Sequence, residues 1–513
     1  MKKILFALSL GFCLSTLYAQ DADIPCKIQK SNIFKDEYRN SELVCVNRDT
    51  NGGVVMVRSY LGSFSTGYYF EHYDSSMKLV NEFHYELKAG VILGTLVNDN
   101  KVHMVEFTYD KTAKAYICIV NTAEINDFKF TPKELFRLER EEVKMGGLFN
   151  ENNFDNDYLA RMLVGSGGGA FAISIDINDR DEKKEMRKIY VYDAGLNLKI
   201  EHFFKRDIKD RRFKFKNIEV SENGEVAYLL GLAETPESQQ KKEGGKYQYE
   251  LSRITNSSIE TQVFDTGDHY TQSLVTVLKK DRIACVGFYS DRNDKRFKGL
   301  CYFDMDPETL EVKTTAFNPF TEQFMIDKYG KNKEKELKFV AFKSVYLAPN
   351  NDIIINAEEN YVTSVRVGGM NTMGATYYNV YHYDDIISAR LSTEGNLIWA
   401  RNINKRQKTD DVASYISYSS MNIDDNTYFF INTGDKVTKL SNDRIQFGQK
   451  SVNRSNLNVI KMDGTGNFQF KQLLDDKENE VPFMVANGAA AGEGNIYFLG
   501  RRGKKKQILK LSL

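Results

Sequence analysis

The residues that could carry catalytic or metal chemistry are scattered along this chain. None of its six histidines stands at metal-ligand spacing from another. They are His72, His84, His103, His202, His269 and His382. No HExxH, GxSxG, Walker A or CxxC motif occurs. We therefore expect no metal and no cofactor, and we favour a protein that is not an enzyme. The alternative is a glycan hydrolase or lyase whose Asp, Glu and His side chains converge from distant segments.

Three short segments resemble ligand sites, and each has a simpler interpretation. The glycine run at residues 165–169 lies between two apolar runs with no helix after it, which predicts a hairpin turn rather than a phosphate site. The acidic residues at 176–182 do not match a calcium-binding loop, so a solvated loop is expected. The basic residues at 501–506 are interpreted as a solvated turn.

The richest cluster of side chains suited to binding lies at residues 361–383. We expect this segment to form a protruding hairpin that turns at glycines 368–374. The candidate binding residues on its second arm are Tyr377, Tyr378, Tyr381, His382 and Tyr383. Tyrosine offers a large rigid surface with a polar tip, which suits contacts with protein or glycan. Tyrosine is also common in strands for packing reasons alone, so both interpretations stay open.

Short apolar or alternating runs must position these residues, because helical periodicity is scarce. The runs are separated by Asn-Gly and related turns, which take the backbone angles that tight hairpins need. A second pattern repeats: LSTEGNLIW at 391–399 matches MDGTGNFQF at 462–470 position for position, with looser copies at 73–79 and 192–198. Each copy predicts a strand, a polar turn and another strand. The repeating unit therefore has four strands.

The units predict a β-propeller, in which four-stranded blades stand around an axis. We place them at about 42–86, 90–139, 158–206, 215–267, 270–320, 342–407 and 415–476. An eighth begins near residue 482 with three strands, and residues 27–38 would supply the fourth. The fold class is thus all-β, a single propeller of eight blades closed by strands from both termini. Seven blades and two tandem β-sandwiches are the alternatives.

The turns in LSTEGNLIWAR and KMDGTGNFQFK resemble those of bacterial secreted β-propeller-repeat proteins. The resemblance implies a fold and no particular activity, because propellers host many functions. Most long connections would lie on one rim, which indicates a binding face. Two insertions are predicted to be helical, near 131–144, where Thr131 and Glu134 form a capping box, and near 320–338.

The N-terminus and the charge balance suggest where the protein works. Residues 1–19 read as a secretory signal peptide, leaving residues 20–513 as the propeller, with no later transmembrane segment. Lys and Arg number 70, as do Asp and Glu, which argues against nucleic acid as a partner. We expect an exported monomer in the periplasm or at the cell surface, a scaffold that binds an envelope protein or glycan through its long-loop face.

Cleavage would leave five cysteines, and two of them invite a specific pairing. Cys285 and Cys301 are equidistant from Asn293 in a predicted hairpin turn. If the flanking strands pair symmetrically, the two side chains face each other and could form a disulfide. Two buried thiols are the alternative.

Overall fold

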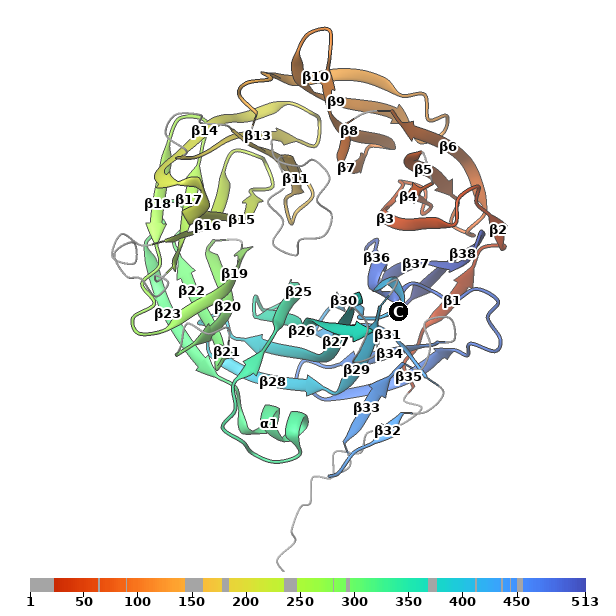
Figure 1. The fold of residues 1–513 in the computed structure, drawn as a ribbon, viewed down its shortest axis with the longest axis vertical. Coiled ribbons are helices and arrows are strands. Elements are labelled where there is room, and N and C mark those ends of the chain that lie inside the picture. Colours follow the sequence, from red (N-terminus) through yellow and green to blue (C-terminus); the bar gives the residue numbers. More distant parts are fainter. Residues whose placement is uncertain are drawn as a thin grey trace, which may run out of the picture.

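The protein is described by a computed structural model that covers residues 23–62, 65–88, 90–143, 160–177, 184–234, 247–279, 281–291, 296–367, 376–410, 413–434, 437–442, 444–449 and 455–513. The predicted signal peptide and the tip of the 361–383 hairpin lie outside these ranges. Within them the chain is nearly all-β, with one α-helix, α1 (Glu322–Tyr329). Four-stranded antiparallel sheets stand around a common centre, as in a β-propeller (Figure 1).

The first four sheets follow one another along the chain, each with its strands in sequential order. The strands of the first two are β3 (Asn40–Arg48), β4 (Val54–Leu61), β5 (Thr66–Tyr73), β6 (Leu79–Leu87), then β7 (Val91–Asn98), β8 (Lys101–Asp110), β9 (Ala115–Glu124) and β10 (Thr131–Glu139). Those of the next two are β11 (Ala160–Val164), β12 (Ala170–Asp176), β13 (Lys184–Asp193), β14 (Leu198–Lys209), then β15 (Phe213–Val220), β16 (Ala227–Glu234), β17 (Tyr247–Ile254) and β18 (Ile259–Val263).

The later sheets keep this order and carry additions. The next two contain β19 (Tyr270–Leu278), β20 (Ile283–Ser290), β22 (Gly299–Met305), β23 (Val312–Pro319), then β25 (Val340–Leu347), β26 (Ile353–Val367), β27 (Thr376–Leu391) and β28 (Leu397–Ile403). The last two contain β30 (Ser419–Ile423), β31 (Asn426–Thr433), β34 (Asn456–Met462), β35 (Phe468–Leu474), then β36 (Ala489–Ala490), β37 (Asn495–Arg502) and β38 (Lys505–Ser512). Short additional strands are β21 (Arg296–Phe297), β24 (Leu337–Lys338), β29 (Lys405–Thr409), β32 (Thr438–Lys439) and β33 (Ile445–Gly448).

The two ends of the described chain meet in one sheet. β1 (Lys27–Lys30) pairs antiparallel with β38, and β2 (Phe34–Lys35) pairs with the same strand. Between them, the Ser31 hydroxyl accepts a hydrogen bond of 2.9 Å from the amide of Ile508. The N-terminal strand therefore adds to the sheet built by the last strands of the chain.

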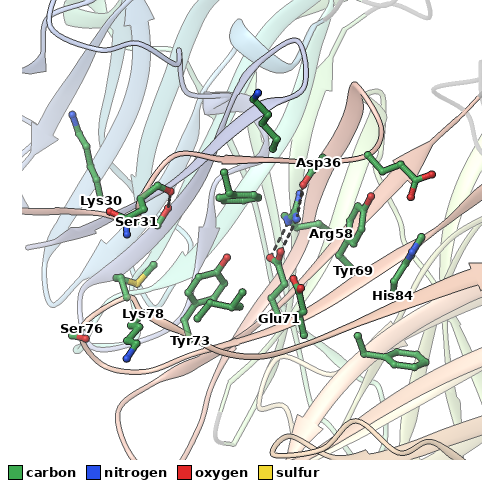
Figure 2. Close-up of a pocket in the computed structure, with 18 residues that line it drawn as sticks. Lys30, Ser31, Asp36, Arg58, Tyr69, Glu71, Tyr73, Ser76, Lys78 and His84 are labelled. Atoms are coloured by element: carbon green, nitrogen blue, oxygen red, sulfur yellow. Dashed lines mark hydrogen bonds and ion pairs between the residues drawn. The ribbon is translucent and has the colours of Figure 1, made fainter.

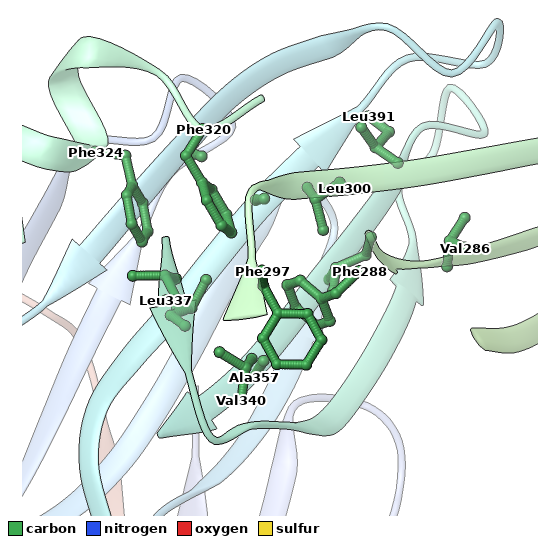
Figure 3. Close-up of a cluster of buried hydrophobic side chains, with 14 of the residues drawn as sticks. Val286, Phe288, Phe297, Leu300, Phe320, Phe324, Leu337, Val340, Ala357 and Leu391 are labelled. Atoms are coloured by element: carbon green, nitrogen blue, oxygen red, sulfur yellow. The ribbon is translucent and has the colours of Figure 1, made fainter. Parts of the chain in front are cut away.

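Buried side chains gather between neighbouring sheets. One such cluster joins Phe288 and Leu300 of the β19–β23 sheet to Ala357 and Leu391 of the β25–β28 sheet (Figure 3). Another cluster contains Leu43, Val54 and Tyr73 from the first sheet with Tyr497, Leu499 and Ile508 from the last. Because each sheet packs through both faces, its central strands are apolar almost without interruption.

The repeated turn has a common geometry. In four copies the first residue accepts backbone N–H groups and the fourth has a positive φ. The first residues are Asp74, Asp193, Ser392 and Asp463, and the fourth are Met77, Leu196, Gly395 and Gly466. Glycine is required at Gly395, where a Cβ would lie 2.1 Å from the ring of Tyr302 on the neighbouring sheet. The repeat predicted from the sequence is confirmed at these turns.

The helix predicted near 131–144 is wrong: Thr131–Glu139 is strand β10, paired with β9. Phe136 and Leu138 are buried and Arg137 is exposed, so the period is two rather than 3.6. Pro132 suits an edge strand, where its missing N–H costs no sheet hydrogen bond. In the other predicted segment, 320–338, the structure has α1. The Thr321 hydroxyl caps the start of this helix by accepting a hydrogen bond of 3.2 Å from the amide of Phe324.

The symmetric hairpin expected around Asn293 is also wrong. Asn293 itself lies outside the described residues, but the register of its flanking strands is defined. Cys285 lies opposite Phe303, and Cys301 lies opposite Gly287. Both cysteines are buried free thiols, diagonal to each other rather than face to face. Burial raises the pKa of each thiol to about 12. The alternative of two buried thiols is the one that the structure shows.

Candidate binding surfaces

The hairpin predicted at 361–383 is present as the outer parts of β26 and β27. The two strands pair from Ile353 opposite Leu391 to Val367 opposite Thr376. A register shift between Glu358 and Asn360 marks where the hairpin leaves its sheet. We call its outer part, residues 360–367 and 376–383, the arm.

Strand alternation divides the predicted binding residues between the two faces of the arm. His382 and Tyr378 lie on one face, with Tyr378 exposed. Tyr381 and Tyr383 lie on the other face. Tyr383 is buried, and its carbonyl accepts a hydrogen bond of 2.7 Å from the ammonium of Lys405. Tyr377 lies in β27, where its backbone pairs opposite Arg366. The five residues therefore do not form one surface.

The face that carries His382 is extended by two aromatic residues that the sequence did not single out. The rings of Tyr361 and His382 stack, with centroids 4.4 Å apart, and Phe339 lies 5.3 Å from Tyr361. The Tyr361 hydroxyl donates to Asp384 at 3.0 Å, and the His382 ring is 2.9 Å from the Thr363 hydroxyl. Burial, followed by the bond to Asp384, raises the pKa of Tyr361 to about 12. We call Phe339, Tyr361, His382 and Tyr378 the aromatic face.

Phe339 is the unusual member of the aromatic face. The residue is 54% exposed, and its backbone has a φ of 60°. A bulky residue in this left-handed region is strained, at a cost of about 1–3 kcal/mol. The strain holds an aromatic ring toward solvent beside Tyr361. Strand β29, which pairs with β27, adds the exposed side chains of Arg406 and Lys408 next to it.

A second candidate surface is a cavity of about 920 Å³ between the first sheet and the N-terminal segment (Figure 2). We call it the terminal groove. From the N-terminal segment it is lined by Lys30, Ser31, Asn32, Phe34, Lys35, Asp36 and Glu37. From the first sheet it is lined by Arg58, Tyr69, Glu71, Tyr73, Ser76, Met77, Lys78, Leu79, Glu82, Phe83 and His84.

The floor of the terminal groove is a buried ionic network centred on Arg58, which is 1% exposed. Its guanidinium donates to both oxygens of Glu71, at 2.9 and 2.6 Å, and to both of Asp36, at 2.7 and 3.1 Å. Ser41 donates to Asp36 at 2.7 Å, and the ring of Tyr69 lies 4.7 Å from the guanidinium carbon. Asp36 therefore connects the N-terminal segment to strand β4 of the first sheet.

Lys506 joins this network from the last strand, β38. Its ammonium lies 3.7 Å from Asp36, and it is fully buried. It also donates to the carbonyls of Tyr38, Arg39 and Gly503. Burial lowers its pKa to about 8. The prediction that residues 501–506 form a solvated turn is wrong for Arg501 and Lys506, which are both buried.

The other segments that resembled ligand sites are structural. Residues 165–169 form the hairpin turn between β11 and β12, closed by a bond of 2.9 Å from the amide of Gly165 to the carbonyl of Ala170. Asp176 is buried and paired with Arg187 at 2.7 Å, not solvated as expected, while residues 178–183 lie outside the described ranges. Arg187 also binds Glu185 at 2.7 Å, and burial raises the pKa of Glu185 to about 8.

Within the described ranges, no group of three or more His, Cys, Asp or Glu side chains is arranged to hold a metal ion. No helix in the same ranges is long and apolar enough to span a membrane.

Comparison with known proteins gives similarity at the level of the fold. No family profile matches the sequence, and no curated protein matches it. The solved structures that are similar include the polysaccharide lyase Uly1, at 11% identity over 94% of this chain and 99% of that one, with a TM-score of 0.40. Prolyl oligopeptidase B from Galerina marginata is 9% identical over 90% and 55%, also with a TM-score of 0.40.

An acylaminoacyl peptidase from Pyrococcus horikoshii is 10% identical over 80% of this chain, with a TM-score of 0.34. The chain spans about half the length of that peptidase, 49%. These similarities concern the fold alone and show no family for the chain.

Proposed function

We propose that the chain is an exported binding scaffold, an eight-bladed propeller that recognises a protein partner through the aromatic face of its arm. Two observations support the ring. Each buried cluster lies between two neighbouring sheets, and one cluster joins the first sheet to the last. The pairing of β1 with β38 supports closure by strands from both ends of the chain. Export rests on the signal peptide predicted at residues 1–19.

The observation that carries the binding role is the strained, exposed ring of Phe339. A strained residue with an exposed side chain lowers the stability of the fold and gains little from burial. Such a residue is expected where the exposed side chain has a role in binding. Exposed Tyr378 extends the same face, and stacked Tyr361 and His382 make it rigid. Aromatic residues held rigidly on a protruding element are typical anchors of protein interfaces.

The charges beside the aromatic face indicate the chemistry of the partner. Arg406 and Lys408 are exposed on β29, and Lys408 lies opposite His382 in the register. An acidic protein surface with an apolar centre would complement this arrangement, and its association would slow as salt is added. The enzymatic alternative is not proposed, because the buried ionisable groups around Arg58 and Arg187 form two closed sets. Arg58 binds Asp36 and Glu71. Arg187 binds Asp176 and Glu185.

The test compares two exposed phenylalanines. Phe339→Asn removes the ring and places at φ 60° a residue that tolerates this angle, so folding stability should be kept or improved. Phe203→Asn is the matched control, since Phe203 is 49% exposed on the outer strand of another sheet. Each purified variant is immobilised and exposed to envelope extract, and captured proteins are quantified at low and high salt.

The proposal predicts a protein captured by the wild type and by Phe203→Asn, captured at least tenfold less by Phe339→Asn, and weakened by salt. Equal capture by the wild type and both variants, or no captured protein at all, would contradict it. Retention of an acidic polysaccharide in place of a protein would also contradict it, because the partner would then belong to another class.

A further inference from the structure

We propose that the terminal groove is a second binding site, and that it takes a neutral oligosaccharide. The groove lies between the first sheet and the N-terminal segment and is built by different residues from the arm. The inference therefore does not depend on the protein-binding role proposed above.

The charge of the groove favours a neutral ligand. Four basic and four acidic side chains line it. The deepest of them, Arg58, Asp36 and Glu71, are paired with one another, and Lys506 lies 3.7 Å from Asp36. Two cations therefore meet two carboxylates at the floor, which presents no net charge. A strongly anionic or cationic ligand would have to break these buried pairs, which is costly. A ligand that offers hydroxyl groups would leave them intact.

Two tyrosines of the groove offer a ligand different groups. Tyr73 lines the groove, and its hydroxyl is not fully buried and makes no hydrogen bond with any residue in the described ranges. The buried hydroxyl of Tyr69 is likewise without a partner there. Both point toward the N-terminal segment across the groove (Figure 2). A hydroxyl that faces a cavity without a protein partner is where a ligand's hydroxyl group, or water in its absence, would bind, and the Tyr73 hydroxyl fits this description. The Tyr69 hydroxyl is shielded from water in this structure, so Tyr69 contributes its ring rather than its hydroxyl.

The walls of the groove provide the apolar half of saccharide recognition. His84 is exposed and its ring stacks against that of Tyr69, with centroids 5.0 Å apart. Phe34 lines the opposite side, and the Arg58 guanidinium is held between Phe34 and Tyr69. A pyranose ring has C–H groups that pack on such flat surfaces and hydroxyls at its edge that hydrogen-bond. A volume of about 920 Å³ lies within the range of ligand sites, about 300–1,000 Å³.

The experiment uses the full chain and a panel of defined sugars: cellohexaose, xylohexaose, mannohexaose and maltohexaose, with hexagalacturonate as the acidic comparison. Binding is measured by titration calorimetry and by saturation-transfer NMR. We expect at least one neutral hexasaccharide to bind, and hexagalacturonate not to bind. Tyr73→Phe deletes only the unpartnered hydroxyl and should weaken binding about fivefold, the effect of one hydrogen bond.

His84→Ala should weaken binding by a similar factor. Two matched variants should leave it unchanged. His269→Ala removes a histidine that packs on Tyr289 and Phe317 of another sheet, and Tyr346→Phe removes a hydroxyl already bound to the carbonyl of Ser420 at 2.8 Å.

Three outcomes would overturn the inference. The first is that no neutral sugar binds at sugar concentrations up to about 5 mM, because a dissociation constant above that value is weaker than most specific binding. The second is binding that Tyr73→Phe and His84→Ala leave unchanged, which would put the ligand elsewhere. The third is binding of the acidic hexamer alone. None of these results bears on protein capture by the arm.

Discussion

The network around Arg58 makes a quantitative prediction about the junction of the chain ends. Arg58→Leu removes the only cation that contacts Glu71 and the main partner of Asp36 among the described residues. Both carboxylates are buried, so Glu71 would be left without a cation, and Asp36 would keep only the more distant Lys506, at 3.7 Å. Removing one member of a buried ion pair typically costs 3–5 kcal/mol. We expect a loss of about 4 kcal/mol in the free energy of unfolding at neutral pH.

The surface arginine Arg137 provides the control. It also binds a carboxylate through two nitrogens, Glu134 at 3.2 and 2.9 Å, but both side chains are more than two-fifths exposed. Exposed pairs contribute about 0–1 kcal/mol, so Arg137→Leu should change stability little. Urea denaturation followed by circular dichroism measures both losses.

Hydrogen exchange shows where the loss falls. The amides of Ser31 and Asp36 bond to the carbonyls of Ile508 and Lys504 across the junction. Arg58→Leu should speed their exchange and leave the β15–β18 sheet unaffected, because openings are local to cooperative units. A loss no larger than that of Arg137→Leu, or faster exchange in every sheet alike, would refute the reasoning.

Two further predictions concern buried titratable groups. Burial raises the pKa of Glu185 to about 8, so between pH 4.5 and 8 the folded chain holds a proton that the unfolded chain releases. The contribution of this proton to the free energy of unfolding is complete below pH 4.5. It falls by up to about 1.4 kcal/mol per pH unit as pH rises to 8. Thermal unfolding across this range should show the slope in the wild type and a flatter one in Glu185→Gln; identical slopes would contradict the assignment. Cys285 and Cys301 have pKa values near 12, so they should resist iodoacetamide at pH 8 until the chain unfolds. Rapid labelling of the folded protein would contradict their description as buried thiols. So would a lack of labelling after unfolding without a reductant.

Much of the sheet architecture could be predicted because it depends on local chemistry. The polar turn is visible at Ser392 and Asp463, since both accept backbone N–H groups, and at Gly395 and Gly466, since glycine adopts a positive φ without strain. The helix expected at Thr131 failed for an equally physical reason. A capping-box pattern is a weak signal, and the burial of Phe136 and Leu138 by the neighbouring sheet outweighs it.

The binding surfaces were harder to predict because they depend on long-range contacts. Arg58 stands in an apolar run, VVMVRSYL, and a charge in such a strand indicates a buried partner without identifying it. The partner, Asp36, comes from a segment 22 residues earlier. Phe339 gives no sequence signal, since its strained φ follows from how the chain enters β25. Only alternation along β27 could have separated Tyr381 from His382 in advance.

The meeting of the chain ends can be tested directly by a disulfide. Gln29 on β1 and Lys510 on β38 lie opposite each other in the register, and both are half-buried. In a background with Cys26→Ser, the pair Gln29→Cys and Lys510→Cys should cross-link under mild oxidation and raise the unfolding temperature. A control pair, Glu260→Cys with Lys510→Cys, joins different sheets and should stay reduced. Failure of the first pair to cross-link in the folded protein, or equal cross-linking of both pairs, would contradict a ring closed by the two ends of the chain.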